Sequence, residues 1–224
     1  MGTLVLVRHG QASFGAADYD VLSDNGREQS RRLGRYLAER GVVAGQVLHG
    51  RQRRQRDTAL ELTAAAGWAG SSEVDGDWDE FDHLTLVGRL APEIHDTTDR
   101  RAFQRAYEVA LGRWVAGRHP EGIEIETYAG FLARVQAALA RATAYAGPGG
   151  TAVVVSSGGP IAAAVASLVD PDGSVDHVAR IWQRMNTVLV NTSYSRVVVG
   201  STGARLLTFN EHPHLAPGPL LTYR

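Results

Sequence analysis

The sequence of 224 residues lacks two residue types altogether: it has no cysteine and no lysine, so all 23 of its basic residues are arginines. The absence of cysteine excludes disulfides and thiolate catalysis, and it leaves only histidines and carboxylates to hold a zinc ion. The absence of lysine excludes a Schiff base and the lysine of a phosphate-binding P-loop. A formal net charge of -1 argues against broad nucleic-acid binding, which usually needs a strongly basic face.

Long apolar runs are missing as well. No stretch of about 18 apolar residues is present, so we expect neither a transmembrane helix nor a membrane partner. The first residues enter a strand pattern without the basic segment and cleavage site of a signal peptide, and the expected location is therefore cytoplasmic. Hydrophobic residues make up 44% of the chain, which is enough for one domain with a sizeable core. No pattern indicates an oligomeric state.

Short apolar runs alternate with helical patterns along the chain. Continuously apolar runs are typical of strands buried on both faces, and they occur at 4–7, 47–48 and 152–155. Apolar residues at helical spacing predict helices over 24–40, 53–66, 99–117, 127–145 and 160–169. Three later runs are strand-like, namely 187–191, 195–199 and 205–209.

Strands that alternate with helices predict an α/β fold, a three-layer sandwich in which a mainly parallel central sheet is covered by helices on both faces. We expect residues 1–224 to form a single domain. Ligands of such sheets bind beyond the carboxyl ends of the strands. Two predicted strand ends carry polar residues there: Arg8-His9-Gly10 after the first strand, and 156–159 after a later one.

Arg8-His9-Gly10-Gln11 directly follows the first predicted strand. A neutral His9 imidazole could attack phosphorus, and the Arg8 guanidinium could bind the phosphoryl oxygens in a fork. Gly10 would let the backbone approach the phosphate closely. A histidine followed by glycine can also simply hydrogen-bond to the backbone at a strand end. The position of this pair, rather than the dipeptide itself, favours the catalytic interpretation.

Two further stretches carry charge. Four arginines stand at or just before the start of the second predicted helix, at positions 51, 53, 54 and 56. A helix N-terminus with arginines can bind an anion, and we expect an anion or carboxylates to compensate these charges. The acidic stretch 77–83 contains Glu80 between Trp78 and Phe81, where burial would raise its pKa and suit it to general acid catalysis. A surface acidic loop is the alternative interpretation.

In chain order, these motifs resemble the histidine phosphatase superfamily, the phosphoglycerate-mutase-like group of phosphatases and mutases. The resemblance rests on Arg8-His9-Gly10, on Arg54-x-x-x-Thr58-Ala59, on Glu80 and on Ser156-x-Gly158-Gly159. The stretch 8–26 is similar to the broad-specificity bacterial phosphatase branch. The match runs from residue 4 to about residue 215, and only 81–125 lacks a counterpart.

The resemblance implies a role for each matched residue. His9 would take the phosphoryl group as a phosphohistidine, without a metal ion or cofactor, and Glu80 would protonate the leaving oxygen and then activate water. Arg8 and Arg54 would bind the phosphoryl oxygens. Gln11 would lie near the pocket mouth, and Gly158 at the phosphate. The ligand would be a small phosphorylated substrate, and 81–125 would form a helical insertion over the pocket mouth.

Two positions depart from the family pattern. Asp57 stands where the family usually has glutamine, and Ser157 stands where it has a second pocket histidine. A serine hydroxyl can still donate a hydrogen bond to a phosphoryl group, but it cannot carry positive charge. Losing one transition-state donor costs roughly 10²–10³ in rate, so reduced activity is expected. Ser157→His would raise turnover if the imidazole fits, or lower it by overpacking if the pocket has adapted to serine. A gain is the favoured outcome, because the adjacent glycines would leave room.

Three functions stay open at this point. The first is a phosphatase that hydrolyses a phosphate monoester through phospho-His9. The second is a degenerate member that binds a phosphorylated ligand or partner with little turnover, and the third is a mutase-type phosphotransferase. His212 and His214 are not expected to bind a metal ion, because no third ligand is in view.

Overall fold

The computed structural model describes residues 1–13, 20–70, 72–94, 100–118, 122, 124–216 and 218–223. Within these residues, six strands form one sheet in the order β3-β2-β4-β1-β5-β6. Their bounds are β1 (Gly2–Arg8), β2 (Gln46–His49), β3 (Glu73–Val74), β4 (Thr151–Ser156), β5 (Tyr194–Gly200) and β6 (Gly203–Glu211).

The sheet is mixed but mainly parallel, which confirms the predicted fold class. β3, β2, β4 and β1 run parallel to one another, whereas β5 is antiparallel to β1 and β6 to β5. Arg8 at the end of β1 pairs with Ser156 at the end of β4. The two polar strand ends that the sequence predicts therefore lie side by side at one edge of the sheet.

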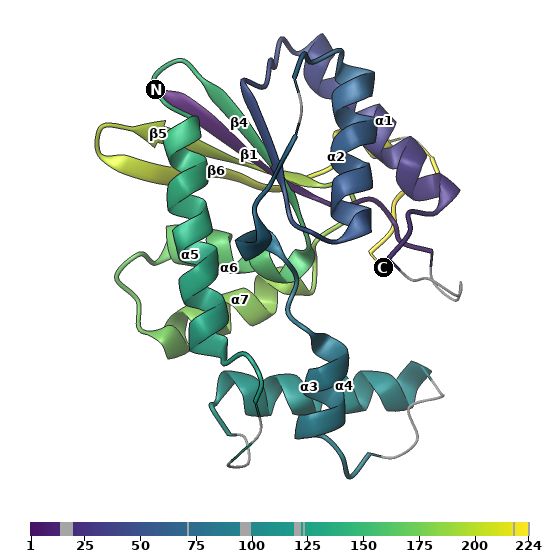
Figure 1. Ribbon diagram of the computed structural model, residues 1–224, viewed down its shortest axis with the longest axis vertical. Coiled ribbons are helices and arrows are strands. Elements are labelled where there is room, and N and C mark those ends of the chain that lie inside the picture. Colours follow the sequence, from purple (N-terminus) through teal and green to yellow (C-terminus); the bar gives the residue numbers. More distant parts are fainter. Residues whose placement is uncertain are drawn as a thin grey trace.

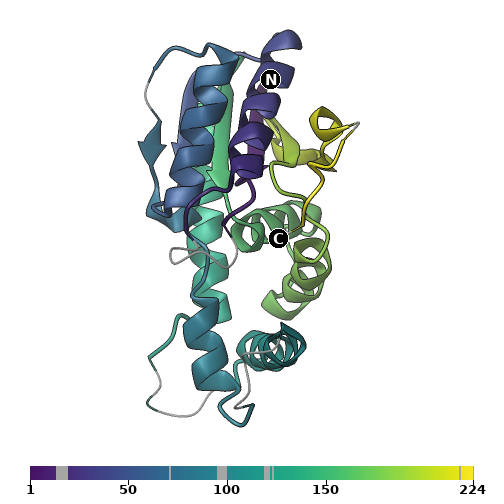
Figure 2. The ribbon, with the colours of Figure 1, turned by 90° about the vertical axis from the view of Figure 1, so that its right-hand side faces the viewer.

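Helices cover both faces of the sheet (Figures 1 and 2). Alternation along β1 divides the core: Val5 and Val7 pack with α1 (Asp24–Glu39) and α2 (Arg53–Ala66), whereas Leu4 and Leu6 belong to the core on the other face. The helices of that other face are α5 (Tyr128–Tyr145), α6 (Gly158–Val169) and α7 (Val175–Asn186). None of the described helices is both long and apolar enough to cross a membrane.

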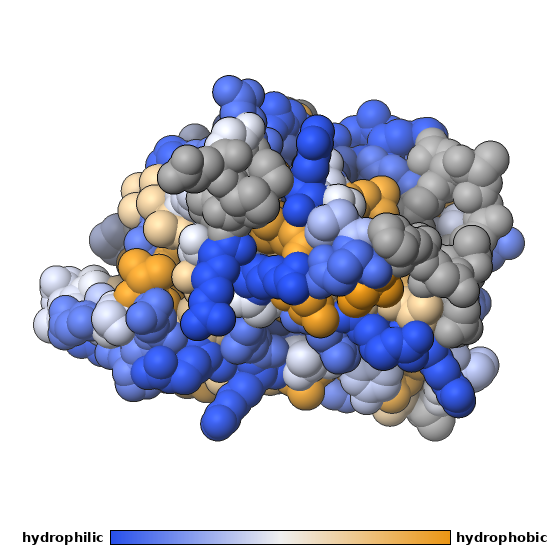
Figure 3. Space-filling model, turned by 90° about the horizontal axis from the view of Figure 1, so that it is seen from below, coloured by the Kyte–Doolittle hydropathy of each residue, from blue (hydrophilic) through white to orange (hydrophobic). Residues whose placement is uncertain are grey.

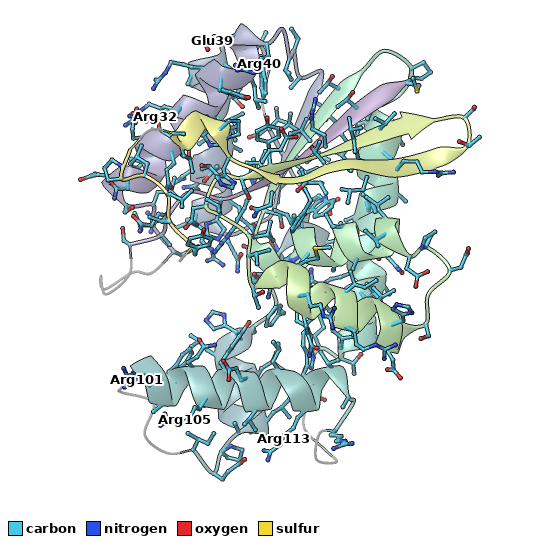
Figure 4. The ribbon with its side chains drawn as sticks, turned by 180° about the vertical axis from the view of Figure 1, so that it is seen from behind. Arg32, Glu39, Arg40, Arg101, Arg105 and Arg113 are labelled. Atoms are coloured by element: carbon cyan, nitrogen blue, oxygen red, sulfur yellow. The ribbon has the colours of Figure 1, made fainter. Side chains whose placement is uncertain are left out.

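Two helices, α3 (His83–Leu90) and α4 (Arg100–Val115), lie beyond the carboxyl ends of the parallel strands (Figure 1). Trp114 of α4 fixes them to the body of the domain, because its ring lies 4.8 Å from that of Phe81 and 5.4 Å from that of Phe131. The surface at this end is mainly hydrophilic with apolar patches (Figure 3). Three arginines lie along α4, namely Arg101, Arg105 and Arg113 (Figure 4).

The structure corrects one predicted element and adds three. Residues 187–191 were expected to form a strand but turn away from the end of α7, and Leu189 and Val190 are buried there. Their apolar pattern reflects burial and not a strand. The backbone nearby makes hydrogen bonds outside the regular pairing of strands: the Thr192 N–H lies 3.1 Å from the Arg8 carbonyl oxygen. β3, α3 and α7 were not predicted. α3 and β3 are short, and α7 follows the turn at 170–174 closely.

Candidate active site

His9 lies immediately after β1, and its side chain is 5% exposed. Its Nδ1 is 2.7 Å from the Gly10 carbonyl oxygen, which can only accept, so Nδ1 carries the proton and Nε2 carries a lone pair. The Arg54 Nε–H donates to this Nε2 at 3.2 Å. Burial, followed by the charges of Arg54 and Arg8, holds the pKa of His9 well below its usual value. The ring is therefore neutral, as a nucleophile requires.

The backbone around His9 explains the Arg-x-x-x-Thr spacing. The Gly10 N–H donates to Thr58 Oγ1 at 2.9 Å, and this hydroxyl donates to the Arg54 carbonyl oxygen at 2.7 Å, one helical turn earlier. A Cβ at Gly10 would lie 2.4 Å from the Gly26 carbonyl oxygen. Glycine is needed at position 10 because α1 approaches so closely, and Thr58 ties the His9 loop to α2.

Arg54 is the charged centre of the site and is 6% exposed. Besides the His9 ring, its guanidinium binds Asp20 Oδ1 at 2.6 Å through Nη1 and Gln52 Oε1 at 2.9 Å through Nη2. Asp20 also accepts the Arg53 backbone N–H at 2.7 Å and so caps the N-terminus of α2 from the loop before α1. Asp20 and Gln52 were not predicted, since an isolated Asp and Gln carry no spacing signal.

Carboxylates compensate two of the other arginines of this stretch, as the sequence predicts. Arg51 forms an ion pair with Asp79 at 2.7 Å, and Arg56 one with Asp57 at 2.9 Å. The side chain of Arg51 is 72% exposed, whereas that of Arg54 is 8% exposed. Arg54 is thus the member of the cluster that is directed into the site.

Glu80 is partly buried and reaches the start of α6. Its Oε2 accepts the Gly159 N–H at 3.1 Å, and its Oε1 accepts the Phe81 N–H at 3.2 Å. A Cβ at Gly159 would lie 2.1 Å from Glu80 Oε1, so this glycine permits the contact. Burial raises the pKa of Glu80 even though the Gly159 hydrogen bond and the Arg54 charge oppose the shift. The direction is the one that the sequence predicts, and it suits a group that must hold a proton.

Arg8 joins the site from the end of β1. Its Nη1 donates to the carbonyl oxygens of Leu189 and Tyr223, the latter at 2.9 Å, and these contacts fix its guanidinium. The Arg8 charge lowers the pKa of both His9 and Glu80, which places it near both groups. A Cβ at Gly158 would lie 3.9 Å from Arg8 Nε. Arg8 and Gly158 thus lie next to each other at this edge of the sheet.

Ser157 is the N-cap of α6 and is 1% exposed, but its side chain makes no capping hydrogen bond. Its Oγ accepts from Gln55 Nε2 at 2.9 Å and donates to Gln52 Oε1 at 3.4 Å. Polar side chains as well as glycines adjoin this position, so an imidazole here would have to displace them. A Cβ at Gly158 would meet Asn186 Oδ1 at 2.9 Å, and the Gln55 amide already contacts the hydroxyl.

Gln11, His212 and His214 are the remaining residues that the sequence singles out. Gln11 Oε1 accepts from the hydroxyl of Ser23, the N-cap of α1, at 3.0 Å. His212 donates from Nδ1 to the Asn210 carbonyl oxygen at 2.7 Å, and His214 Nε2 lies 3.0 Å from Thr192 Oγ1. In the part of the chain that the structure describes, no three histidines or carboxylates gather as a metal site would need.

His83, the first residue of α3, was not predicted as a site residue. Burial and the Arg54 charge lower the pKa of His83, so this ring lies near the guanidinium. The ring also meets that of Tyr107 from α4 edge-on, with centroids 6.4 Å apart. The start of α3 therefore borders the site. The signal for His83 in the sequence is its place at the end of the acidic stretch 77–83.

Comparison with known families agrees with this arrangement. The model of the histidine phosphatase superfamily (branch 1) matches residues 4–212. The chain belongs to the histidine phosphatase superfamily. A search of curated proteins finds no match. The matched range contains the residues of the site described above.

Solved structures share the fold of this histidine phosphatase superfamily member. Bacillus stearothermophilus YhfR has a TM-score of 0.67 and 18% identity, covering 95% of this chain and 98% of its own. A mycobacterial glucosyl-3-phosphoglycerate phosphatase has a TM-score of 0.62 and 24% identity over 94% of this chain and 99% of its own. A phosphoserine phosphatase mutant from Entamoeba histolytica, in complex with phosphoserine, has a TM-score of 0.65 and 17% identity over 96% and 100%.

Proposed function

We propose that this chain is a phosphatase that hydrolyses small phosphate monoesters through a phosphohistidine on His9. The observation that carries the proposal is the state of the ring. His9 is neutral, its Nδ1 proton is bound to the Gly10 carbonyl oxygen, and its Nε2 lone pair faces the Arg54 guanidinium. A phosphoryl group bound by Arg54 would therefore meet a nucleophile that is already deprotonated.

In the first step, the Nε2 lone pair forms a bond to phosphorus, and the bond between phosphorus and the ester oxygen breaks. Glu80 gives its proton to the departing oxygen, so an alcohol leaves and Glu80 becomes a carboxylate. The raised pKa of Glu80 favours the protonated form that this step consumes. Arg8 and Arg54 bind the phosphoryl oxygens through charged hydrogen bonds.

In the second step, water attacks the phosphorus of phospho-His9 and gives a proton to the Glu80 carboxylate. The bond from phosphorus to Nε2 breaks, and its electron pair returns to the ring. Inorganic phosphate leaves, and the site regains a neutral His9 and a protonated Glu80. Every proton in this scheme is carried by the chain, the substrate or water, so the proposed cycle uses neither a metal ion nor a cofactor.

The substrate is proposed to be a small phosphorylated molecule in the cytoplasm, with no nucleic-acid or membrane partner. The names of two structural neighbours point to phosphate esters of this kind, phosphoserine and glucosyl-3-phosphoglycerate. We place α3 and α4 over the pocket mouth, with Gln11 at its rim, because the Arg54 charge acts on His83 at the start of α3. Variation in 81–125 would then set substrate choice.

A binding protein with little turnover is the second candidate, because Ser157 contributes a neutral hydroxyl where a charged donor is usual. A mutase-type phosphotransferase is the third. Turnover of p-nitrophenyl phosphate, measured with and without a chelator, decides among them. The phosphatase proposal expects chelator-resistant release of phosphate. Phosphate binding without turnover would favour the binding protein, and transfer of phosphate to a second alcohol in preference to water would favour the mutase.

A further inference from the structure

Gln52 Oε1 occupies an unusual position for an amide oxygen. Three donors from separate segments of the chain surround it: Arg54 Nη2 at 2.9 Å, the Glu80 backbone N–H at 3.4 Å and the Ser157 hydroxyl at 3.4 Å. An amide oxygen offers two lone pairs, whereas three convergent donors are typical of a site built for a charged oxygen. Arg54, one of the three, also contacts the nucleophile.

The Ser157 hydroxyl is directed at Gln52 Oε1 because, as the N-cap of α6, it finds no N–H of that helix to accept from. An N-cap serine accepts from the second or third N–H of its helix. In α6 the second N–H, that of Gly159, is bound to Glu80 Oε2 at 3.1 Å, and the third residue is Pro160, which has no N–H. The serine side chain is therefore available to the site.

Gln55 fixes the direction of that hydroxyl. Its fully buried amide donates from Nε2 to Ser157 Oγ at 2.9 Å and to the Trp78 carbonyl oxygen at 3.3 Å. A flipped amide would place two carbonyl oxygens side by side, so this orientation is favoured. With an Oγ lone pair bound by Gln55, the hydroxyl proton is left to point at Gln52 Oε1.

The Gln52 side chain itself has no task in the helix that it precedes. It is the N-cap residue of α2 and makes no side-chain capping bond, while Asp20 accepts both the Arg53 N–H at 2.7 Å and the Arg54 N–H at 3.4 Å. It is partly buried, whereas Ser157, Gln55 and Arg54 are each 6% exposed or less. Gln52 can therefore swing away while the groups around its oxygen stay in place.

We propose that Gln52 is an internal competitor of phosphate, because its Oε1 occupies a phosphoryl-oxygen subsite between Arg54 Nη2, the Glu80 N–H and the Ser157 hydroxyl. Gln52 fills this subsite until a phosphate displaces it, and so it competes with every phosphorylated ligand. Gln55 is a positioning residue that aims the Ser157 proton. This inference rests on the proposed function for its substrate class, but phosphate binding can be measured without any turnover.

The test is calorimetric titration of the full chain with inorganic phosphate. Gln52→Ala removes the competing oxygen and should lower the Kd for phosphate about three- to tenfold, the effect of roughly one hydrogen bond. Gln52→Glu places a carboxylate against Arg54 and should raise the Kd by more than about tenfold. Gln136→Ala is the matched control, because Gln136 also bonds a serine, Ser167 at 3.1 Å, but between α5 and α6. It should leave the Kd unchanged.

An unchanged or raised Kd for phosphate in Gln52→Ala overturns the subsite. A raised Kd would mean that the Gln52 amide donates a hydrogen bond to phosphate, and an unchanged Kd would mean that its oxygen does not compete with phosphate. If Gln52→Ala fails to fold, Gln52→Asn is used, since its shorter side chain withdraws the oxygen and should also lower the Kd. Absence of phosphate binding in both the wild type and Gln52→Ala likewise overturns the subsite. If the wild type binds phosphate but does not hydrolyse esters, only the proposed function is wrong. The expected difference in the Kd for phosphate between Gln52→Ala and Gln52→Glu still tests the subsite.

Discussion

The dipeptide His-Gly occurs twice in this chain, at the ends of two strands in the same parallel group. His9-Gly10 follows β1, and His49-Gly50 ends β2, with β4 between them. Both rings are buried, and both hold Nδ1 against the next carbonyl oxygen, at 2.7 Å for His9 and 2.6 Å for His49. The two histidines therefore match in burial and in the contact of Nδ1, and we refer to them as the twins.

Their surroundings differ. The Arg54 guanidinium contacts His9 Nε2 at 3.2 Å, and the Gly10 N–H is bound to Thr58 of α2. In the part of the chain that the structure describes, the His49 ring has no hydrogen bond to an arginine, and the Gly50 N–H returns to β4 through the Val155 carbonyl oxygen at 3.4 Å. The dipeptide itself thus supplies only a buried ring with Nδ1 against the next carbonyl oxygen, and the charged neighbours turn it into a site.

The largest contrast is expected from replacing each twin. His9→Asn should lower turnover of p-nitrophenyl phosphate by about 10³-fold or more, because the nucleophile is lost. His49→Asn should keep turnover within about threefold and cost roughly 1–3 kcal/mol of unfolding free energy, since a buried hydrogen bond is disturbed. Steady-state kinetics and urea unfolding check both. A folded His49→Asn that loses as much turnover as His9→Asn would contradict the comparison.

Removing the feature that separates the twins should have the next largest effect. Arg54→Gln withdraws the charge from His9 Nε2 and from the phosphoryl oxygens, and kcat/KM should fall by about 10²–10³-fold. Arg51→Gln is the control from the same cluster, with a side chain that is 72% exposed, and it should change kcat/KM by less than about threefold. Equal losses in the two variants would mean that the cluster acts only as a diffuse positive field.

Glu80 should make the reaction sensitive to the leaving group and to pH. Burial raises the pKa of Glu80, so the acid stays protonated to higher pH than an ordinary glutamate, and turnover of alkyl phosphates should fall as pH rises through that raised pKa. Glu80→Gln should cost about 10²-fold on alkyl phosphates and remove this alkaline limb, but cost less than about tenfold on p-nitrophenyl phosphate. A limb that survives in Glu80→Gln would assign it to another group.

Ser157 should give the smallest effect. Ser157→Ala removes one neutral donor and should lower kcat by roughly tenfold, about 1.4 kcal/mol. Ser157→His should also lower kcat, because an imidazole would have to displace the Gln55 amide, whose Nε2 lies 2.9 Å from the Ser157 hydroxyl. Thermal melts of both variants separate loss of function from loss of folding. A gain in kcat for Ser157→His would show that Gln52 and Gln55 yield to a larger side chain.

Much of the framework could be predicted from the sequence, because local patterns encode it. The apolar runs of β1 and β4 and the helical spacing of α2 and α5 determine the sheet and its layers. Parallel strands that end at one edge bring His9 and Ser157 together, and Arg54 reaches His9 from the first turn of α2. Residues 187–191 were misassigned since a buried irregular segment has the composition of a strand.

The polar side chains between these residues could not be predicted. Gln52, Gln55 and Asp20 matter because of what they touch: Gln52 and Gln55 meet the Ser157 hydroxyl, and Asp20 meets Arg54. No period or motif marks such long-range contacts between single polar side chains. The amides beside Ser157 could not be predicted for the same reason, because its neighbours in sequence are glycines, whereas Gln52 and Gln55 meet its hydroxyl in space.

Direct mapping of the phosphorylated residue tests whether His9 is the phosphoryl acceptor. The wild-type protein is mixed briefly with substrate, quenched in alkali, cleaved after arginine and analysed by mass spectrometry and phosphorus NMR. Cleavage places His9 on the peptide 9–27 and His49 on the peptide 41–51, so the twins separate cleanly. Acid-labile phosphate is expected on 9–27, bonded to Nε2 of His9. Phosphate on 41–51, acid-stable phosphate on a serine, or steady turnover with no phosphorylated protein would contradict it.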